Sequence, residues 1–202
     1  GAMALLKSAE DGALSTDIEF DAGEALRSCR FDDVRMLAGQ VLPPETTRDG
    51  KPLPTIAELM TLTGDATRGR GVFFSEERSQ CYQCHVVGNE GRRVGPDLSA
   101  IGAKFGKEGL LESILNPSAA IAHEYVVWVV ETRNGDLLTG HLRKDTPDGI
   151  ELVDSTGAAI TVPAANITDR YQSDMSLMPN GLAAGMTAQE LADVVAFLAS
   201  QK

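Results

Sequence analysis

The spacing of apolar residues along the chain predicts several helices, and the clearest of them lies close to the C-terminus. There, apolar residues recur at intervals of three and four, which places them on one stripe of a helix. These residues are Leu191, Val194, Val195 and Leu198. Thr187 and Glu190 have the spacing of a capping box, and Met186 occupies the hydrophobic-staple position before it. A helix is therefore expected to begin at Thr187.

Three shorter helices are predicted upstream, over residues 55–62, 65–74 and 107–115. Thr55 and Glu58 again have capping-box spacing, and Asp65 can cap the next helix. Asn116-Pro117 ends the third helix, because the residue before a proline avoids the helical region of backbone space.

Gly69 predicts where two of these helices meet. It lies four residues before Phe73, so both residues share one face of the expected helix. Because glycine has no side chain, a second helix can approach its backbone closely. We expect that second helix to be the C-terminal one, which has the best-defined apolar stripe.

Between residues 124 and 171 the pattern changes to that of β-strands. Asn134-Gly135 separates two runs rich in β-branched residues, which is the strongest short-range signal for a hairpin. Two more turns follow, at 146–149 and 155–157. Two more strands are predicted at 149–153 and 158–162. The segment is therefore predicted to form an antiparallel β-meander of four or five strands, shaped as a small SH3-like or open barrel.

These elements divide the chain into an arm, a main unit and an insertion. Residues 63–202 are the main helical unit, and residues 124–171 are a β insertion within it. Residues 1–62 are an N-terminal arm and linker, in which 21–41 has enough apolar residues for one or two helical turns. Prolines mark the linker as extended; they are Pro43, Pro44, Pro52 and Pro54. The expected fold class is mainly α with an inserted small antiparallel β-meander.

Composition and charge narrow the class of protein. Hydrophobic residues make up 43% of the 202 positions, so a packed core is expected and global disorder is not. The net charge of −11 argues against binding to nucleic acid or anionic lipid, and would steer the protein toward a basic partner. No apolar run approaches the ~20 residues of a membrane helix. We therefore expect no nucleic-acid partner and no membrane insertion.

Cys81-Tyr82-Gln83-Cys84-His85 carries the main chemical signal of the sequence. C-x-x-C-H is the attachment signature of covalently bound haem c, in which two thiols hold the haem and the histidine becomes an iron ligand. One copy predicts one haem. A redox-active dithiol is less favoured, because that motif occurs in a βαβ unit and the residues before Cys81 look helical. A zinc site is also less favoured, because the other Cys and His residues have no paired spacing. Cys29 is expected to be a buried bystander.

The iron ligands are predicted from residues around this motif. His85 is the expected proximal ligand, and the backbone carbonyl near Pro96 can accept its other ring N–H and fix its tautomer. The sixth ligand must come from methionine or histidine. Met178 is the leading candidate, because a neighbouring proline and glycine stiffen its loop, and His123 or an open position are the alternatives. His141 is expected to be a surface side chain.

Three further stretches complete a resemblance to a known family; they are Arg68–Phe73, Leu111–Ser118 and Ser176–Leu182. With the C-x-x-C-H motif and Gly95-Pro96-Asp97-Leu98, they make residues 63–202 resemble a class I cytochrome c. More narrowly, this part resembles the haem-binding domain at the C-termini of large secreted proteins of planctomycetes and verrucomicrobia, the β insertion included. The N-terminal arm lies outside the resemblance.

The resemblance implies a periplasmic electron-transfer module, often fused to a β-propeller dehydrogenase-like domain or to helical repeats. The expected function is that of a monohaem electron carrier and not of an enzyme. We expect a periplasmic or secreted location, and a redox partner protein or a fused dehydrogenase domain as partner. Because covalent haem attachment implies export in bacteria, the chain is expected to be a mature part of a longer secreted protein.

Two other functions stay open at the level of the sequence. The first is a haem-based peroxidase, or a gas or redox sensor, in which the sixth ligand can be displaced from iron. The second is a docking module that acts through the β insertion. A mobile loop around Met178 would favour the first function, and exposed aromatic side chains on the strands would favour the second.

Overall fold

The structure is a computed structural model, and it describes residues 1–14, 22–23, 25–26, 29, 31–42 and 45–202. The helices in this part are α1 (Ala2–Glu10), α3 (Asp32–Val41), α4 (Ile56–Thr61), α5 (Ala66–Phe73), α6 (Ile101–Lys104), α7 (Lys107–Leu115) and α8 (Ala188–Ser200). The strands are β1 (Val86–Val87), β2 (Glu90–Gly91), β3 (Val127–Thr132), β4 (Leu137–Thr146), β5 (Gly149–Val153), β6 (Ala159–Pro163) and β7 (Ile167–Ser173). Short 3₁₀ turns are η1 (Cys81–Gln83), η2 (His123–Tyr125), η3 (Ala164–Asn166) and η4 (Leu182–Gly185).

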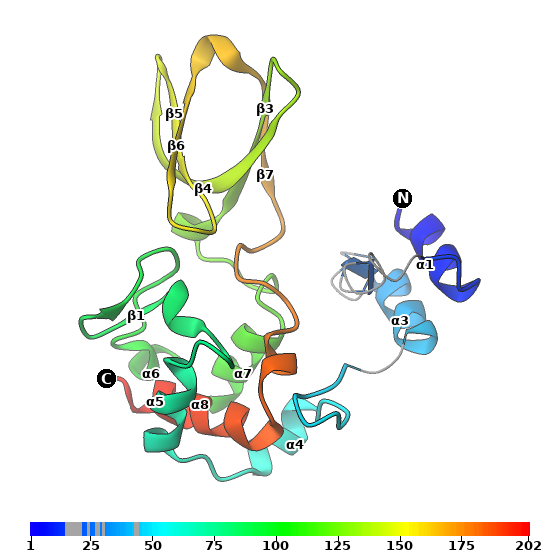
Figure 1. Cartoon of the computed structure of the whole chain (residues 1–202), viewed down its shortest axis with the longest axis vertical. Helices are drawn as coiled ribbons and strands as arrows, with labels where there is room; N and C mark the ends of the chain where they lie inside the picture. Colours follow the sequence, from blue (N-terminus) through cyan, green and yellow to red (C-terminus); the bar gives the residue numbers. More distant parts are fainter. Residues whose placement is uncertain (15–21, 24, 27–28, 30, 43–44) are drawn as a thin grey trace.

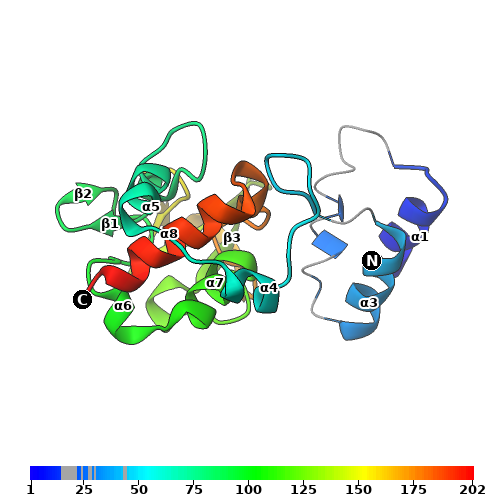
Figure 2. The ribbon, with the colours of Figure 1, turned by 90° about the horizontal axis from the view of Figure 1, so that it is seen from below.

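Helices α5 and α8 pack against each other at the centre of the helical part (Figure 2). A Cβ atom on Gly69 would collide with the backbone carbonyl oxygen of Asp193, so only glycine fits where the two backbones meet. The predicted contact of Gly69 with the C-terminal helix is therefore confirmed. The buried core around this contact includes Phe73, Leu110, Leu111, Leu191, Val194, Val195 and Leu198.

Both predicted capping boxes are present at the ends of helices in this core. The hydroxyl of Thr55 accepts a hydrogen bond from the Glu58 N–H, and Thr187 and Glu190 repeat the arrangement at the start of α8. Met186, which precedes the second box, is buried in the helical core, as expected for a hydrophobic staple. The sequence signals for helix starts were therefore correct at both positions.

Asp193 is buried on α8 and fixes the start of α5. Its carboxylate accepts hydrogen bonds from the Asp65 N–H (2.8 Å), the Arg68 Nε (2.8 Å) and the Gln189 Nε2 (2.9 Å). Burial alone would raise the pKa of Asp193, but these hydrogen bonds and the charge of Arg68 hold that pKa below its ordinary value. The ionised carboxylate thus ties α5 to α8.

We expect Asp193→Asn to lower the free energy of unfolding by about 1–3 kcal/mol at neutral pH, because the N–H groups of Asp65, Arg68 and Gln189 lose their charged acceptor. A depressed folded-state pKa gives stability that is present above the unfolded-state pKa, about 3.9, and is lost as the pH falls through the folded-state pKa. Urea titrations should therefore show the difference from wild type shrinking in acid. Asp174→Asn, at an exposed aspartate, is the control. An equal difference in acid would contradict the role given to the charge.

Residues 127–173 form a five-stranded antiparallel sheet in the order β6-β5-β4-β3-β7. In the β3–β4 turn, Gly135 has φ +86° and its N–H donates to the carbonyl of Thr132, as the Asn-Gly signal predicted. The sheet curves strongly and stands at one end of the molecule, beyond the helices (Figure 1). Strands β3 to β6 follow one another in chain order, so a four-stranded meander is confirmed, whereas β7 crosses to the other edge, pairs with β3 and runs on to Ser173.

The prediction of a mainly α fold is wrong. Helices make up 40% of the structure and strands 21%, so the fold is mixed α/β with a five-stranded antiparallel sheet. The physical reason is that the β segment is not a minor addition to a helical core. It has a buried apolar cluster of its own, formed by Val130, Ile150, Leu152 and Val162.

The N-terminal arm contains a second small apolar core, formed by Leu6, Leu26, Val34 and Ala38. Helix α3 supplies part of it and is longer than the one or two turns predicted there. Part of that predicted stretch, and Pro43 and Pro44 of the predicted linker, lie outside the described residues. The following segment contacts the start of α8: the Arg48 N–H donates to the carbonyl of Met186, and its guanidinium pairs with Glu190 at 3.0 Å.

Candidate functional site

The two thiols and the imidazole of the C-x-x-C-H motif emerge from a single turn of chain. The carbonyl oxygen of Cys81 accepts hydrogen bonds from the N–H groups of Cys84 (3.1 Å) and His85 (2.9 Å), which closes the turn η1. Just before it, the buried hydroxyl of Ser79 donates to the carbonyl of Val72 at the end of α5 (2.7 Å). The turn is therefore fixed to the central helix pair.

Cys81 and Cys84 are not bonded to each other, and both thiols are held in their protonated form. Burial raises the pKa of Cys81, and it also raises that of Cys84, where the charge of Arg92 partly opposes it. A disulfide oxidoreductase needs the opposite, a thiol whose pKa is lowered. These thiols also follow a helix and not a strand of a βαβ unit. Both observations disfavour the redox-dithiol interpretation.

The imidazole of His85 is half-buried and has a fixed tautomer. Its Nδ1 lies 2.9 Å from the carbonyl oxygen of Pro96, which can only accept, so Nδ1 carries the proton. Burial lowers the pKa of His85, although this hydrogen bond opposes the shift, and the ring is therefore neutral. Its Nε2 then has a lone pair, and it has no hydrogen-bond partner in the described part of the chain. The predicted contact between His85 and Pro96 is present.

Gly95 packs directly against the ring of His85. A Cβ atom at this position would lie 2.7 Å from Cε1 and 3.0 Å from Nδ1 of the imidazole, so a side chain cannot be accommodated without movement of the ring. The N–H groups of Val94 and Gly95 both donate to the carbonyl of Cys84, at 3.1 and 2.8 Å. The segment 94–96 thus holds one face and one nitrogen of the imidazole.

Met178 lies in a loop that is anchored to the end of α7. Its N–H donates to the hydroxyl of Ser176 (3.1 Å), and the Ser176 N–H donates to the hydroxyl of Ser118 (3.0 Å). Downstream, Gly181 has φ +72° and begins the turn η4. Met178 and Cys81 are both partly buried and pack against the same helical core. The structure thus brings the Met178 loop and the C-x-x-C-H turn to the surface of one core.

The alternative sixth ligand, His123, and the staple residue, Met186, are in different settings. His123 is exposed in η2, and Met186 is buried in the helical core, 1% exposed. Within the described residues, no group of three or more His, Cys, Asp or Glu side chains lies close enough together to hold a metal ion. A haem ligated by one histidine and one methionine does not require such a group.

His141 was expected at the surface and is less exposed than that expectation implied. It is half-buried, and its ring meets that of Tyr125 edge to face with 5.3 Å between centroids. Burial lowers the pKa of His141, and a hydrogen bond with the backbone of Val94 opposes the shift. In a strand where apolar and polar residues alternate, a histidine is expected on the exposed face. The packing of the sheet against the segment after β2 half-buries this one.

The donor set of this site fits a covalently bound haem. Two protonated thiols and a neutral imidazole with a free Nε2 lie on one turn, and the second imidazole nitrogen is fixed by a backbone carbonyl. The chain matches no protein-family profile and no curated protein sequence. In the part of the chain that the structure describes, each helix is too short or too polar to span a bilayer.

Proposed function

We propose that this chain is a monohaem c-type cytochrome that carries single electrons. The observation that carries the proposal is the His85 turn: one turn presents two thiols and a neutral imidazole whose Nδ1–H is bonded to the carbonyl of Pro96. This is the arrangement that covalent haem attachment and axial ligation by histidine require. The resemblance to class I cytochromes c remains part of this proposal.

Each residue has one role in the proposed site. Cys81 and Cys84 would hold the haem through thioether bonds, and the Nε2 of His85 and the sulfur of Met178 would ligate its iron. The carbonyl of Pro96 orients the imidazole and increases its basicity. When bound, the haem supplies an iron that changes between the ferric and ferrous states. No bond in a substrate is made or broken, and the protein is not an enzyme.

The anchoring of the Met178 loop supports a closed iron site. Two hydroxyl groups, from Ser118 and Ser176, accept hydrogen bonds from the backbone of this loop. A thioether is a weak ligand, and a loop held in this way reduces the entropy lost when it binds iron. A histidine–methionine pair also raises the reduction potential relative to other axial pairs. Both properties suit an electron carrier and leave no open position for peroxide or a gas.

The proposed location is periplasmic or secreted, because covalent haem attachment implies export in bacteria. The proposed partners are a redox partner protein or a fused dehydrogenase domain of the same polypeptide. The net charge of −11 favours a partner surface with positive charge, since complementary charges speed association. We propose that the chain acts as the C-terminal module of a larger secreted redox protein.

The ferrous protein is expected not to bind carbon monoxide rapidly at neutral pH, and peroxide turnover is expected to be negligible. The physical reason is that Met178 fills the position where these ligands would bind. Rapid mixing measures the rate of carbon monoxide binding, and a peroxidase assay measures the turnover of peroxide. Met178→Ala is the positive control and should bind carbon monoxide quickly. Fast binding or robust turnover by the native protein would instead support the peroxidase or sensor function.

A further inference from the structure

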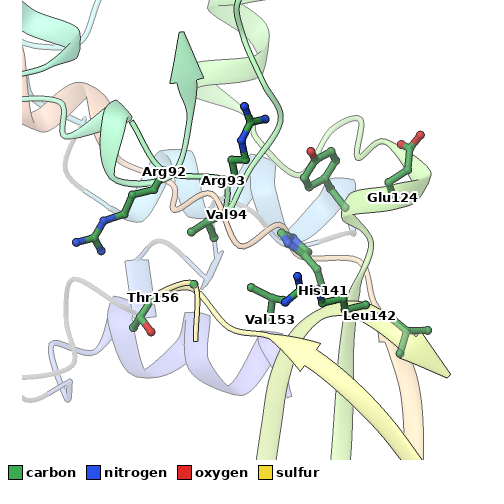
Figure 3. Close-up of a pocket in the computed structure, with 11 residues that line it drawn as sticks. Arg92, Arg93, Val94, Glu124, His141, Leu142, Val153 and Thr156 are labelled. Atoms are coloured by element: carbon green, nitrogen blue, oxygen red, sulfur yellow. The ribbon is translucent and has the colours of Figure 1, made fainter. Parts of the chain in front are cut away.

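A cavity of about 600 Å³ lies where the sheet meets the segment that follows β2 (Figure 3). Arg92, Arg93 and Val94 approach it from the side of the C-x-x-C-H turn. Strands β4 and β5 and the turn between β5 and β6 approach it from the side of the sheet, and η2 closes a third side. The cavity therefore lies between the segment that follows β2 and the sheet.

The contacts between these two parts fix the walls of the cavity. His141 and Val94 both line the cavity, and the ring of His141 meets that of Tyr125 edge to face, with 5.3 Å between centroids. On the other side, a Cβ atom on Gly157 would lie 3.2 Å from a methyl carbon of Val94, so the β5–β6 turn rests on this valine. The next residue, Gly95, packs against the imidazole of His85. The cavity wall at Val94 is thus followed directly in the chain by the residue that packs against the candidate iron ligand.

The lining is positively charged although the chain as a whole is acidic. Three arginines and one glutamate line the cavity; they are Arg92, Arg93, Arg143 and Glu124. Arg93 lies 3.3 Å from Asp97, and Arg143 lies 3.5 Å from Glu151. Both are long ion pairs, and both arginines are largely exposed, whereas Glu151 is only 19% exposed. Arg92 makes no ion pair within the described residues. Because a guanidinium has five N–H donors, most of these donors are available to a ligand.

The remaining walls are apolar or aromatic. Val94, Leu142 and Val153 contribute aliphatic surface, and Tyr125 contributes a half-buried ring. Arginine pairs with carboxylates through planar, bidentate hydrogen bonds. We propose that this cavity binds the carboxylate of a ligand that also has an apolar body. The site needs both the sheet and the segment after β2, which gives the β insertion a role in ligand binding.

The carboxylate in the cavity can come from two molecules. The first is the haem, through its two propionate groups, and this possibility rests on the proposed function. The second is a free small carboxylate, and this possibility is independent of the proposed function. In either case Arg143, which lies on β4 and far from the C-x-x-C-H turn in sequence, contacts the carboxylate. Lys144 is a matched control: it is the next residue of the same strand, pairs with the same Glu151, and does not line the cavity.

The free carboxylate is tested with benzoate, and with benzamide as its uncharged analogue. Calorimetric titration of the full chain as isolated should show benzoate binding with a dissociation constant of about 1 mM and much weaker binding of benzamide. Arg143→Gln should weaken benzoate binding at least about tenfold, and Lys144→Gln should leave it unchanged. Methyl NMR shifts of Leu142 and Val153 on titration would locate the benzoate.

The haem propionates are tested through the reduction potential of the same variants. If they occupy the cavity, benzoate will not bind, and Arg143→Gln will lower the potential because a cation that favours the ferrous state is lost. The pH at which the reduction potential changes will also rise, because a propionate that has lost its arginine partner has a higher pKa. Lys144→Gln should cause neither change. A chain that carries no haem would refute the proposed function but would leave the benzoate titration valid.

Two outcomes would overturn the carboxylate site itself. One is equal binding of benzoate and benzamide, which would mean that the cavity recognises only an apolar body. The other is no binding of benzoate together with the same potential and the same pH dependence in Arg143→Gln and Lys144→Gln. In that case the arginines would be solvated surface charges that make no specific contact with a ligand.

Discussion

Replacement of Cys81 and Cys84 together by serine is expected to abolish covalent haem attachment completely. The two sulfur atoms emerge from one turn that also presents His85, and a hydroxyl group cannot form the thioether bond. Haem staining of the protein after denaturation, and the mass of the intact chain, measure the attachment. Each single replacement should leave one thioether, so the haem should still remain with the chain after denaturation.

Cys29→Ser is the matched control for this experiment. Cys29 is a free cysteine like the other two, but it lies in the N-terminal arm and packs against the small core there. The variant should therefore keep its haem through denaturation, as the wild type does. Retention of covalent haem by the double variant, or its loss in Cys29→Ser, would contradict the assignment of Cys81 and Cys84.

Gly95→Ala is expected to disturb the imidazole of His85, the proposed iron ligand, directly. The new Cβ would lie 2.7 Å from Cε1 of His85, closer than the two atoms can remain, so the ring or the segment around it must move. Overpacking of this kind costs about 1–3 kcal/mol. The visible spectrum and the pH stability of the haem-loaded variant should show weakened ligation, and its Tm should fall.

Gly106→Ala separates this effect from the general cost of replacing a glycine. Gly106 precedes α7 with φ −77°, and a Cβ there would meet no atom within 4 Å. This variant should have the spectrum and stability of the wild type. If Gly95→Ala behaved in the same way, the packing of Gly95 against His85 would have no consequence for ligation.

The local features of the site could be predicted from the sequence because short-range chemistry determines them. The capping boxes at Thr55 and Thr187 depend on residues three positions apart, and the turn at Asn134-Gly135 depends on a dipeptide. The contact between His85 and Pro96 spans eleven residues, and the motif itself indicated it. The approach of α8 to Gly69 could be predicted because a glycine in a helix suggests close packing.

The features that failed depend on how separate parts of the chain pack together. The fold class was wrong because the strands after Tyr125 build their own buried cluster instead of covering a helical core. The exposure of His141 was overestimated for a related reason. Its strand has an alternating pattern that suggests an exposed side chain, and the packing of the sheet against the segment after β2 half-buries the ring. No signal in one sequence specifies that contact.

The central claim is that His85 and Met178 together close the coordination sphere of a covalently bound haem. Visible and near-infrared spectra of the ferric and ferrous protein, for wild type and for Met178→Ala, test it most directly. We predict a low-spin ferric spectrum with the methionine–iron charge-transfer band, and loss of that band in Met178→Ala. A high-spin ferric spectrum in the wild type, or a low-spin spectrum that is unchanged in Met178→Ala, would contradict the claim.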